Sequence, residues 1–276
     1  MNKSIDEIEF TIFDTETTGI DPSTGDRIVE IAAVRLKGEE RLATFQSLIN
    51  CGRDISEAAF NVNKISQDML KGAPTPNLVI PNFLDFIGSS CLCSYNAGFD
   101  LEFLNSELKI LGKPALSGVA VVDILKIARR IIPGLERYAL WFVADKLGIK
   151  AEQQHRALAD VELTLGVFNK LKEVLKTKDI LDFDKFLGLF SIDPLVLDNV
   201  NNQKIAQIQE AIDLRLKLKI KYLSGASAAV TEREVVPKEI KRENNRNYLV
   251  GYCCLRREER SFRIDSILRL EIINGD

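Results

Sequence analysis

The stretch EFTIFDTETTGID, residues 9–21, is where the prediction of the fold begins. In it, two carboxylates follow directly after an apolar segment. Phe10, Ile12 and Phe13 predict a buried strand over residues 9–14. Side chains two residues apart in a strand point to the same face, so Asp14 and Glu16 are expected to converge there. Taken alone, the pair is also typical of a solvated turn that follows a strand.

The segments on either side of this strand predict an α/β layer fold. Strands are expected at 9–14, 27–36 and 41–50, a helix at 77–88, a strand at 91–96, a helix at 99–112, a strand and a helix within 119–132, and helices at 137–148 and 155–178. Residues 177–204 mix apolar and turn residues and indicate a domain junction. A helical opening follows, and then short strands with turn residues between them, which predict a small β-rich domain.

Composition narrows the class of protein. The chain has 276 residues, of which 46% are hydrophobic and 28% are charged, as in ordinary globular proteins. No apolar run reaches the roughly 18–20 residues that span a bilayer, and the first residues lack the apolar region of a signal peptide, so a cytoplasmic location is expected.

The five cysteines are spaced for structural thiols rather than for a zinc site or a disulfide scaffold. From Ile205 onward, Lys and Arg outnumber Asp and Glu by 14 to 11, which is compatible with a nucleic-acid partner.

Two later segments add polar groups that could complete a metal site. SYNAGFD (94–100) ends a short strand near Asp100, which could equally be a helix N-cap. HRALAD (155–160) holds the only histidine of the chain, His155, five residues before Asp160. A lone histidine is usually structural or exposed, but a histidine on a loop with an aspartate on the following helix could place a base and a metal ligand in one cleft. Carboxylate oxygens are the ligands that Mg²⁺ and Mn²⁺ prefer.

Three segments together carry a resemblance to a known family. FDTETTG, SYNAGFDLEFL and HRALAD resemble the three motifs of the DEDD superfamily of 3′–5′ exonucleases, and the third resembles the DEDDh branch, which includes the PolC-type exonucleases and the epsilon subunit of DNA polymerase III. The resemblance covers residues 6–176 and implies a ribonuclease H-like mixed sheet flanked by helices. It also implies that two Mg²⁺ or Mn²⁺ ions are held by Asp14, Glu16, Asp100 and Asp160, with His155 as the general base.

The resemblance extends to residues that would contact the terminal nucleotide. The segment 60–75 is similar to the family segment between the first two motifs. The candidate substrate-binding residues are Thr15, Thr17, Thr18, Gly19, Asn63, Asn96 and Phe99. Many family members have His where this chain has Tyr95 and Asn63, which leaves base stacking and substrate preference open.

The C-terminal segments IKYLSG, REVVPKEI and NRNYLVGYCCLRREERSFRIDSI resemble a WYL domain over residues 205–273, with Asn247 where the family usually has Trp. This implies an Sm-like β-barrel of the kind linked to nucleic-acid or nucleotide ligands. Arginine forks bind phosphate and tyrosines stack on bases, so the candidate nucleic-acid contacts are Arg233, Tyr248, Arg256, Arg257, Arg260 and Arg263. The alternative is a solvated strand face with neighbouring glutamates.

The function expected from these motifs is metal-dependent 3′–5′ exonuclease activity on single-stranded nucleic acid, DNA more than RNA. It would release nucleoside 5′-monophosphates by a two-metal mechanism, with the WYL-like domain aiding binding or regulation. Two alternatives stay open: a ligand-sensing regulatory protein with a vestigial nuclease fold, and an RNA-directed exoribonuclease. A polymerase partner is less favoured than a stand-alone enzyme. The expected division is residues 1–178, a linker at 179–204, and residues 205–276.

Overall fold

The computed structural model describes residues 3–150, 155–192, 194–244 and 246–273. The strands are β1 (Glu9–Thr17), β2 (Ile28–Lys37), β3 (Glu40–Leu48), β4 (Cys91–Ser94), β5 (Val121–Asp123), β6 (Lys217–Leu223), β7 (Val230–Glu243), β8 (Arg246–Cys253), β9 (Glu258–Arg263) and β10 (Ile267–Ile273). The α-helices are α1 (Glu57–Asn63), α2 (Gln67–Leu70), α3 (Pro76–Ile87), α4 (Ala97–Ile110), α5 (Ile124–Ile131), α6 (Leu140–Lys146), α7 (Ala157–Thr177), α8 (Phe183–Phe190) and α9 (Pro194–Asp213). Short 3-10 helices lie at η1 (Ile5–Glu7), η2 (Pro22–Thr24) and η3 (Ile264–Ser266).

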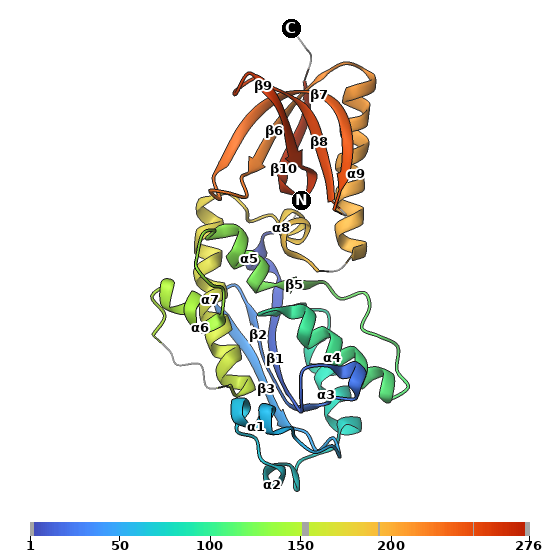
Figure 1. The fold of residues 1–276 in the computed structure, drawn as a ribbon, viewed down its shortest axis with the longest axis vertical. Coiled ribbons are helices and arrows are strands. Elements are labelled where there is room, and N and C mark those ends of the chain that lie inside the picture. The colour runs from blue at the N-terminus through green and yellow to red at the C-terminus, as the bar shows by residue number, and fades with distance from the viewer. Residues whose placement is uncertain (1–2, 151–154, 193, 245, 274–276) are drawn as a thin grey trace.

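The N-terminal part is built on a mixed sheet with the strand order β3-β2-β1-β4-β5 (Figure 1). The first three strands form an antiparallel meander, while β4 and β5 run parallel to β1. The helices cover both faces: α5, α6, α7 and α8 share one apolar core with the sheet, and α3 and α4 share the other. This is the expected α/β, ribonuclease H-like arrangement.

The central strand β1 explains where the acids lie. Phe10 and Ile12 belong to the core on the α7 side, whereas Phe13 belongs to the core on the α3–α4 side. The strand continues to Thr17, so the period of two places Asp14 and Glu16 on the same face as Phe10 and Ile12. The apolar half of that face packs under α7, and Phe10 contacts Phe168 at 5.3 Å between ring centroids. The acidic half extends past the core toward the start of α7.

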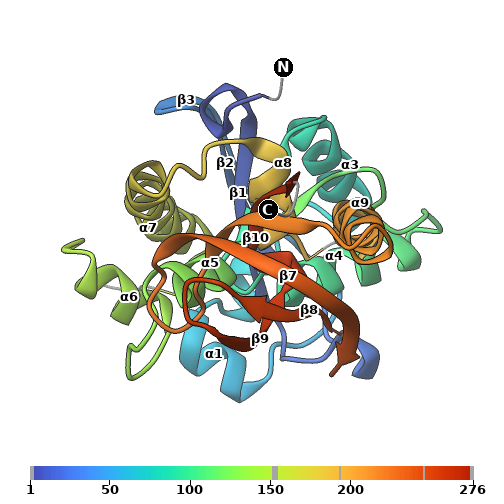
Figure 2. The ribbon, with the colours of Figure 1, turned by 90° about the horizontal axis from the view of Figure 1, so that it is seen from above.

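The C-terminal part is an antiparallel sheet with the strand order β10-β6-β7-β8-β9. Figure 2 looks onto this strongly curved sheet, with α9 along one side, and Ile208 and Ala211 of α9 are buried against it. The resemblance implied a barrel. Among the described residues, no pairing joins the edge strands β9 and β10, so the sheet is open. A bulge in β7 between Pro237 and Glu239 interrupts the ladder where the sheet bends.

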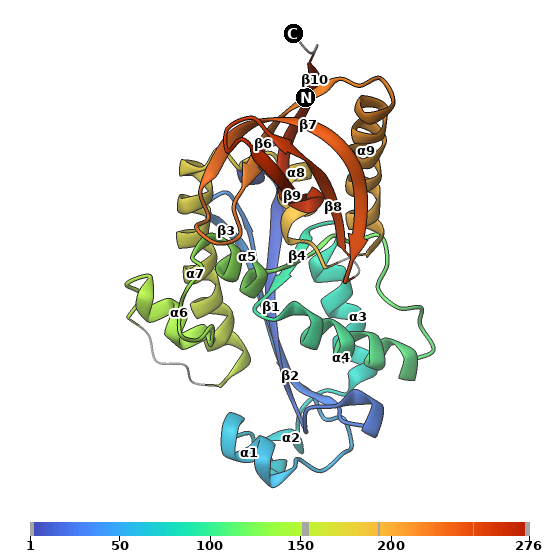
Figure 3. The same ribbon diagram turned by 45° about the horizontal axis from the view of Figure 1, so that its top comes forward.

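The two parts pack against each other through α5 and α8 (Figure 3). Leu223 and Leu268 of the C-terminal sheet are buried in the same core as α7 and α8. Residues 177–204, read from the sequence as irregular, contain α8 and the first half of α9. Among the described residues, no helix combines the length and the apolar character needed to cross a bilayer.

Candidate active site

Three carboxylates from two elements meet at the end of β1. One oxygen from each of Asp14, Glu16 and Asp160 lies within 4.8 Å of the others. Asp160 belongs to the first turn of α7, which begins beside the acidic half of β1. The resemblance predicted that these three acids act together, and the geometry brings them together.

Burial and mutual repulsion govern the protonation of this cluster. Desolvation, and then the charges of Asp100 and Glu16, raise the pKa of Asp14 well above its usual range. Desolvation, followed by the charges of Asp160 and Glu30, raises the pKa of Glu16 to about 8. A divalent cation between these oxygens would offset the repulsion, and hard oxygen ligands suit Mg²⁺ or Mn²⁺. The donor set therefore fits the metals that the resemblance implies.

Asp100 lies beside the three-acid cluster with its carboxylate held by the protein. Its Oδ1 accepts hydrogen bonds from the Thr15 amide at 2.9 Å and the Thr15 hydroxyl at 2.7 Å, and its Oδ2 accepts one from the Ser94 hydroxyl at 2.5 Å. Burial raises its pKa to about 6, although these hydrogen bonds act in the opposite direction. Asp100 is near enough to act on the charge of Asp14, and its role as a fourth metal ligand stays a prediction.

His155 stands at the edge of the cluster. Its Nδ1 atom is 4.0 Å from Oδ2 of Asp160, and its side chain is 45% exposed. The residue occupies the left-handed region with φ at 48°, immediately before the N-cap of α7. The imidazole is therefore open to solvent and adjacent to a buried acid, as a residue that exchanges a proton with water requires.

The threonines at the end of β1, Thr15, Thr17 and Thr18, form hydrogen bonds within the protein. Beyond the bonds of Thr15 to Asp100, the Thr17 hydroxyl donates to the Gly19 carbonyl at 2.5 Å, and the Thr18 hydroxyl donates to Asp26 at 3.1 Å. A Cβ at Gly19 would lie 2.2 Å from the Asp26 carboxylate. These side chains shape the loop, and their contact with a nucleotide stays a prediction.

Of the remaining candidate substrate residues, Asn63 lies nearest the acids. It is buried, donates from Nδ2 to the Thr17 carbonyl at 3.3 Å, and its side chain hydrogen-bonds Glu16, which lowers the pKa of that acid. Lys64 follows in the left-handed region. Asn96 is exposed at the N-cap of α4, and Phe99 packs against Phe103 at 4.9 Å. Their contact with a nucleotide is likewise still a prediction.

Two residues of the site were missed by sequence reasoning. Glu30 on β2 is fully buried and is the register partner of Glu16. Arg156 reaches it with two hydrogen bonds, at 2.8 and 3.0 Å. The available signal was the single acid inside the apolar run IVEIAAV, because an acid in a strand that is buried on both faces requires a partner.

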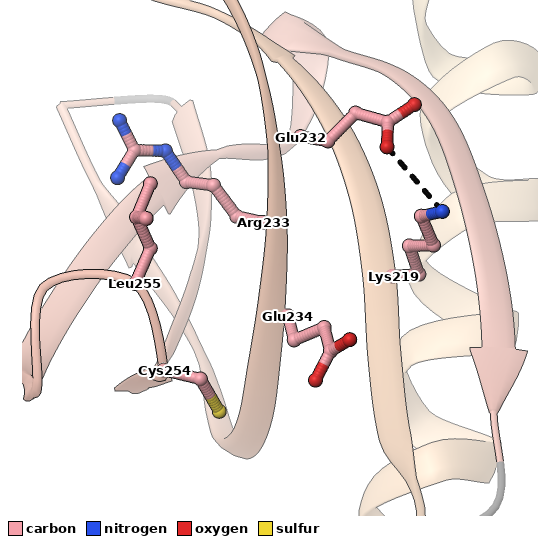
Figure 4. Close-up of a pocket in the computed structure, with 6 residues that line it drawn as sticks. All are labelled: Lys219, Glu232, Arg233, Glu234, Cys254 and Leu255. Atoms are coloured by element: carbon pink, nitrogen blue, oxygen red, sulfur yellow. Dashed lines mark ion pairs between the residues drawn. The ribbon is translucent and has the colours of Figure 1, made fainter.

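The C-terminal candidates lie in different places on β7, β8 and β9. Arg233 lines a hollow with Lys219, Glu232, Glu234, Cys254 and Leu255 (Figure 4), where its guanidinium donates to Thr231 at 3.1 Å. Arg256, Arg257 and Arg260 are exposed in and after the turn from β8 to β9. At the other end of this strand pair, Tyr248 lies opposite Arg263, which forms an ion pair with Asp265 at 2.5 Å.

The comparisons with known proteins agree with this geometry. The sheet order and the acid cluster define an α/β nuclease domain of the ribonuclease H-like class. Residues 11–168 match the exonuclease family (RNase_T), which is more than half of the chain, so the chain belongs to that family. Residues 203–272 match the WYL domain. The chain thus carries an exonuclease domain and a WYL domain, as the motifs predicted.

The exonuclease domain of this chain is similar to parts of longer polymerases and to solved exonuclease structures. A DNA polymerase III PolC-type of Clostridium perfringens is 32% identical over 252 residues, covering 89% of this chain but 17% of the polymerase. Another from Staphylococcus haemolyticus is 33% identical over 176 residues, covering 63% of this chain and 12% of that protein. Among solved structures, exonuclease X in complex with 5′ overhanging duplex DNA has a TM-score of 0.51 at 24% identity over 63% of this chain and 95% of that one. The nuclease domain of 3′hExo, described as a DEDDh family member bound to rAMP, has a TM-score of 0.55 at 20% identity, with the same coverage.

Proposed function

We propose that the chain is a metal-dependent 3′–5′ exonuclease that hydrolyses single-stranded nucleic acid, DNA in preference to RNA, and releases nucleoside 5′-monophosphates. The observation that carries the proposal is the convergence of Asp14, Glu16 and Asp160, three acids from distant parts of the chain, with His155 beside them. An acid cluster whose members raise one another's pKa is unfavourable for folding alone, and it is explained by a bound cation.

Asp14, Glu16 and Asp160 would hold the metal, with Asp100 as the fourth acid of the site. Two bound Mg²⁺ or Mn²⁺ ions would supply Lewis-acid stabilisation of the phosphate and of the leaving oxygen. Asp100 is fixed by Thr15 and Ser94, so it can keep its orientation while substrate enters and product leaves. The Asn63 side chain favours the ionised form of Glu16, because it lowers the pKa of that acid.

His155 would accept the proton of the attacking water. Its exposed imidazole can release that proton to solvent, and histidine is the side chain that most often serves as a general base. Asp160 lies close enough to favour the imidazolium that forms. The left-handed backbone at His155 turns the chain sharply before α7 and sets the base apart from the helix.

The proposal is tested with a 3′-labelled single-stranded oligonucleotide and Mn²⁺. Asp14→Ala or Asp160→Ala is expected to abolish degradation without unfolding the protein, and His155→Ala to lower the rate about 10²–10⁴-fold. Glu162→Ala, an exposed acid on α7 that pairs with Arg41, is the matched control and should keep full activity. Full activity of the Asp14 or Asp160 variant would exclude the proposed reaction.

The substrate is identified by comparing DNA and RNA strands of equal length, together with a dinucleotide. Single-stranded DNA, RNA and a dinucleotide, each labelled at the 3′ end, distinguish a deoxyribonuclease from an exoribonuclease, because recognition of the 2′-hydroxyl depends on a few pocket atoms. This chain spans 17% and 12% of the lengths of the two polymerases described above. Because a WYL domain follows its nuclease domain, we propose that it works as a stand-alone processing enzyme. A preference of ten-fold or more for RNA would overturn the DNA assignment.

The WYL domain is proposed to hold the strand beyond the cleavage site. Arg256, Arg257 and Arg260 support this role because they are exposed. Arg260 has an exposed ion pair with Glu258 at 3.0 Å, whereas Arg263 is partly buried and pairs with Asp265. The matched family ranges support the division into residues 1–178, a connecting segment 179–204 and residues 205–276. The helix α8 in the connecting segment packs into the nuclease core, so binding is best tested in the full chain.

Replacing Arg256, Arg257 and Arg260 together with Ser should weaken binding of a long single strand and leave dinucleotide cleavage unchanged. Three lost phosphate contacts would lower the slope of log affinity against log salt by about 2. The control removes the same charge from Lys238, Lys241 and Arg269, which are exposed and paired with glutamates. Equal losses in both triple variants would argue against the proposed strand path.

A further inference from the structure

The buried acid Glu30 lies between the two elements that build the candidate active site. It belongs to β2 and sits directly opposite Glu16 of β1 in the antiparallel register. Opposite residues of an antiparallel pair point to the same face, so Glu30 points toward α7. It is fully buried, and its charge acts on both Asp14 and Glu16.

Every acceptor position of Glu30 is occupied by the protein. Oε1 accepts from Nη2 of Arg156 at 2.8 Å and from Nε2 of Gln46 at 3.1 Å. Oε2 accepts from Nε of Arg156 at 3.0 Å and from the Ala157 amide at 3.1 Å. A carboxylate offers about four acceptor sites, so Glu30 is not available as a metal ligand. Among the described residues, the metal-binding group of acids does not include it.

Three of these four donors come from the two residues that follow His155. Arg156 is the N-cap of α7, and its carbonyl accepts the first helical bond, from the Asp160 amide at 3.0 Å. The bidentate fork fixes the guanidinium in a plane, and the Ala157 amide fixes the first turn of the helix. Glu30 thereby ties the backbone between the base and Asp160 to the strand next to β1.

We propose that Glu30 is a positioning residue, which holds His155 over the carboxylate cluster through Arg156 and Ala157. The imidazole is 45% exposed, and its Nδ1 atom lies 4.0 Å from Oδ2 of Asp160, which is too long for a hydrogen bond that would fix its place. The placement of His155 comes instead from the residue after it. Loss of this anchor would leave the acids of β1 in place and let the base move away from them.

The chain contains a matched control for this arrangement. Arg27 forms an equivalent fork with buried Glu107, at 2.7 and 2.7 Å, and Glu107 also accepts from the Ile28 amide at 3.2 Å. Both pairs combine an arginine fork, a buried glutamate and one backbone amide donor, and Glu30 has the additional donor Gln46. This second pair ties α4 to the loop before β2 and contacts neither His155 nor α7. Glu30→Gln and Glu107→Gln therefore remove similar interactions, and only the first affects the His155 segment.

The first test does not depend on activity. Because His155 is the only histidine, the imidazole Hε1 proton gives one NMR signal, and bound Mn²⁺ broadens it steeply with decreasing distance. We expect strong broadening in the wild type and in Glu107→Gln, and clearly weaker broadening in Glu30→Gln at equal occupancy by Mn²⁺. Arg156→Lys keeps the charge, loses the fork and should fall between them. Broadening in Glu30→Gln equal to that of the wild type would overturn the proposal.

The second test rests on the proposed function and uses a double-mutant cycle. Glu30→Gln should lower kcat about 10–100-fold, as loss of a partner that orients a ligand typically does. It should change kcat less than about three-fold in the His155→Ala background, since residues that act as one unit are not additive. Equal losses in both backgrounds would assign Glu30 a purely structural role. An inactive wild type with the expected broadening would refute the nuclease assignment and leave the positioning role intact.

Discussion

Glu16 shows how single residues of this site oppose folding in the absence of metal. It ionises near 4.5 in an unfolded chain, whereas burial and the neighbouring acids raise its pKa in the folded protein to about 8. Between these pH values the unfolded state binds fewer protons than the folded state, so stability falls as pH rises. Asp14, whose pKa is raised in the same direction, adds to this effect.

We therefore predict that the melting temperature in EDTA falls by several degrees between pH 5 and pH 8, since about 1 kcal/mol corresponds to about 2–4 °C. Mn²⁺ should raise the melting temperature more at pH 8 than at pH 5, because it binds the ionised acids. Glu16→Gln should flatten the pH profile, and Glu162→Gln should not, as its carboxylate is exposed. A flat wild-type profile measured by circular dichroism would refute this account.

At the scale of elements, the loop after β1 depends on one close contact. A Cβ at Gly19 would overlap the Asp26 carboxylate at 2.2 Å, and Asp26 accepts hydrogen bonds from Thr18 and from the Asp21 amide. Gly19→Ala should push Asp26 aside and cost about 1–3 kcal/mol, measured by urea unfolding. Gly72→Ala is the control, because nothing lies within 4 Å of its Cβ. Equal stability of the two variants would show that Asp26 moves freely.

Sequence reasoning predicted the elements that have one apolar stripe. The helix expected at 155–178 is α7, Ala157–Thr177, and the meander is β1, β2 and β3. Sequence reasoning predicted that the first strand ends at Asp14, whereas the strand runs to Thr17. The polar residues at its end resemble a turn as long as their hydrogen-bond partners are not known. Sequence reasoning interpreted residues 177–204 as irregular. The apolar residues of α8, including Phe186 and Phe190, make sense only once they are seen to pack into the core of the sheet.

The site was predicted less evenly than the fold. The four acids and His155 stand in recognisable motifs, and three of the acids converge. The bond of Thr15 to Asp100 joins residues that are distant in sequence, and no local pattern indicates it. Ser94 lies in the same motif as Asp100, but its bond to Asp100 depends on the turn between them. The same holds for Glu30, which reads as one more strand residue until Arg156 is placed next to it.

At the scale of the whole molecule, a buried ion pair joins the two parts. Arg130 of α5 lies 3.4 Å from Asp265 of η3 and is 9% exposed. It also donates to the Ser266 hydroxyl and to the Leu189 carbonyl. Burial alone would raise the pKa of Asp265, but Arg130 and Arg263 hold it below its usual range. The pair therefore stabilises the interface above the ordinary pKa of aspartate and loses this effect as pH falls further.

Asp265→Asn should destabilise the full chain by about 3–5 kcal/mol, because it leaves a buried guanidinium without its anion. Thermal unfolding should then separate into two transitions as the parts lose their coupling. Asp179→Asn is the control, since Asp179 pairs with Lys221 across the same junction while 79% exposed, and such pairs contribute less than about 1 kcal/mol. A single unshifted transition in Asp265→Asn would show that apolar contacts alone hold the parts together.

The order of the acids along the chain has a consequence for synthesis on the ribosome. Asp14 and Glu16 lie on β1, the first strand made, whereas Asp160 lies in α7 and His155 immediately before it, more than 130 residues later. Domains fold as their residues emerge, so a nascent chain shorter than about this point lacks both the base and the third acid. A chain that emerges in this order therefore acquires the complete acid cluster only after the start of α7 has been made.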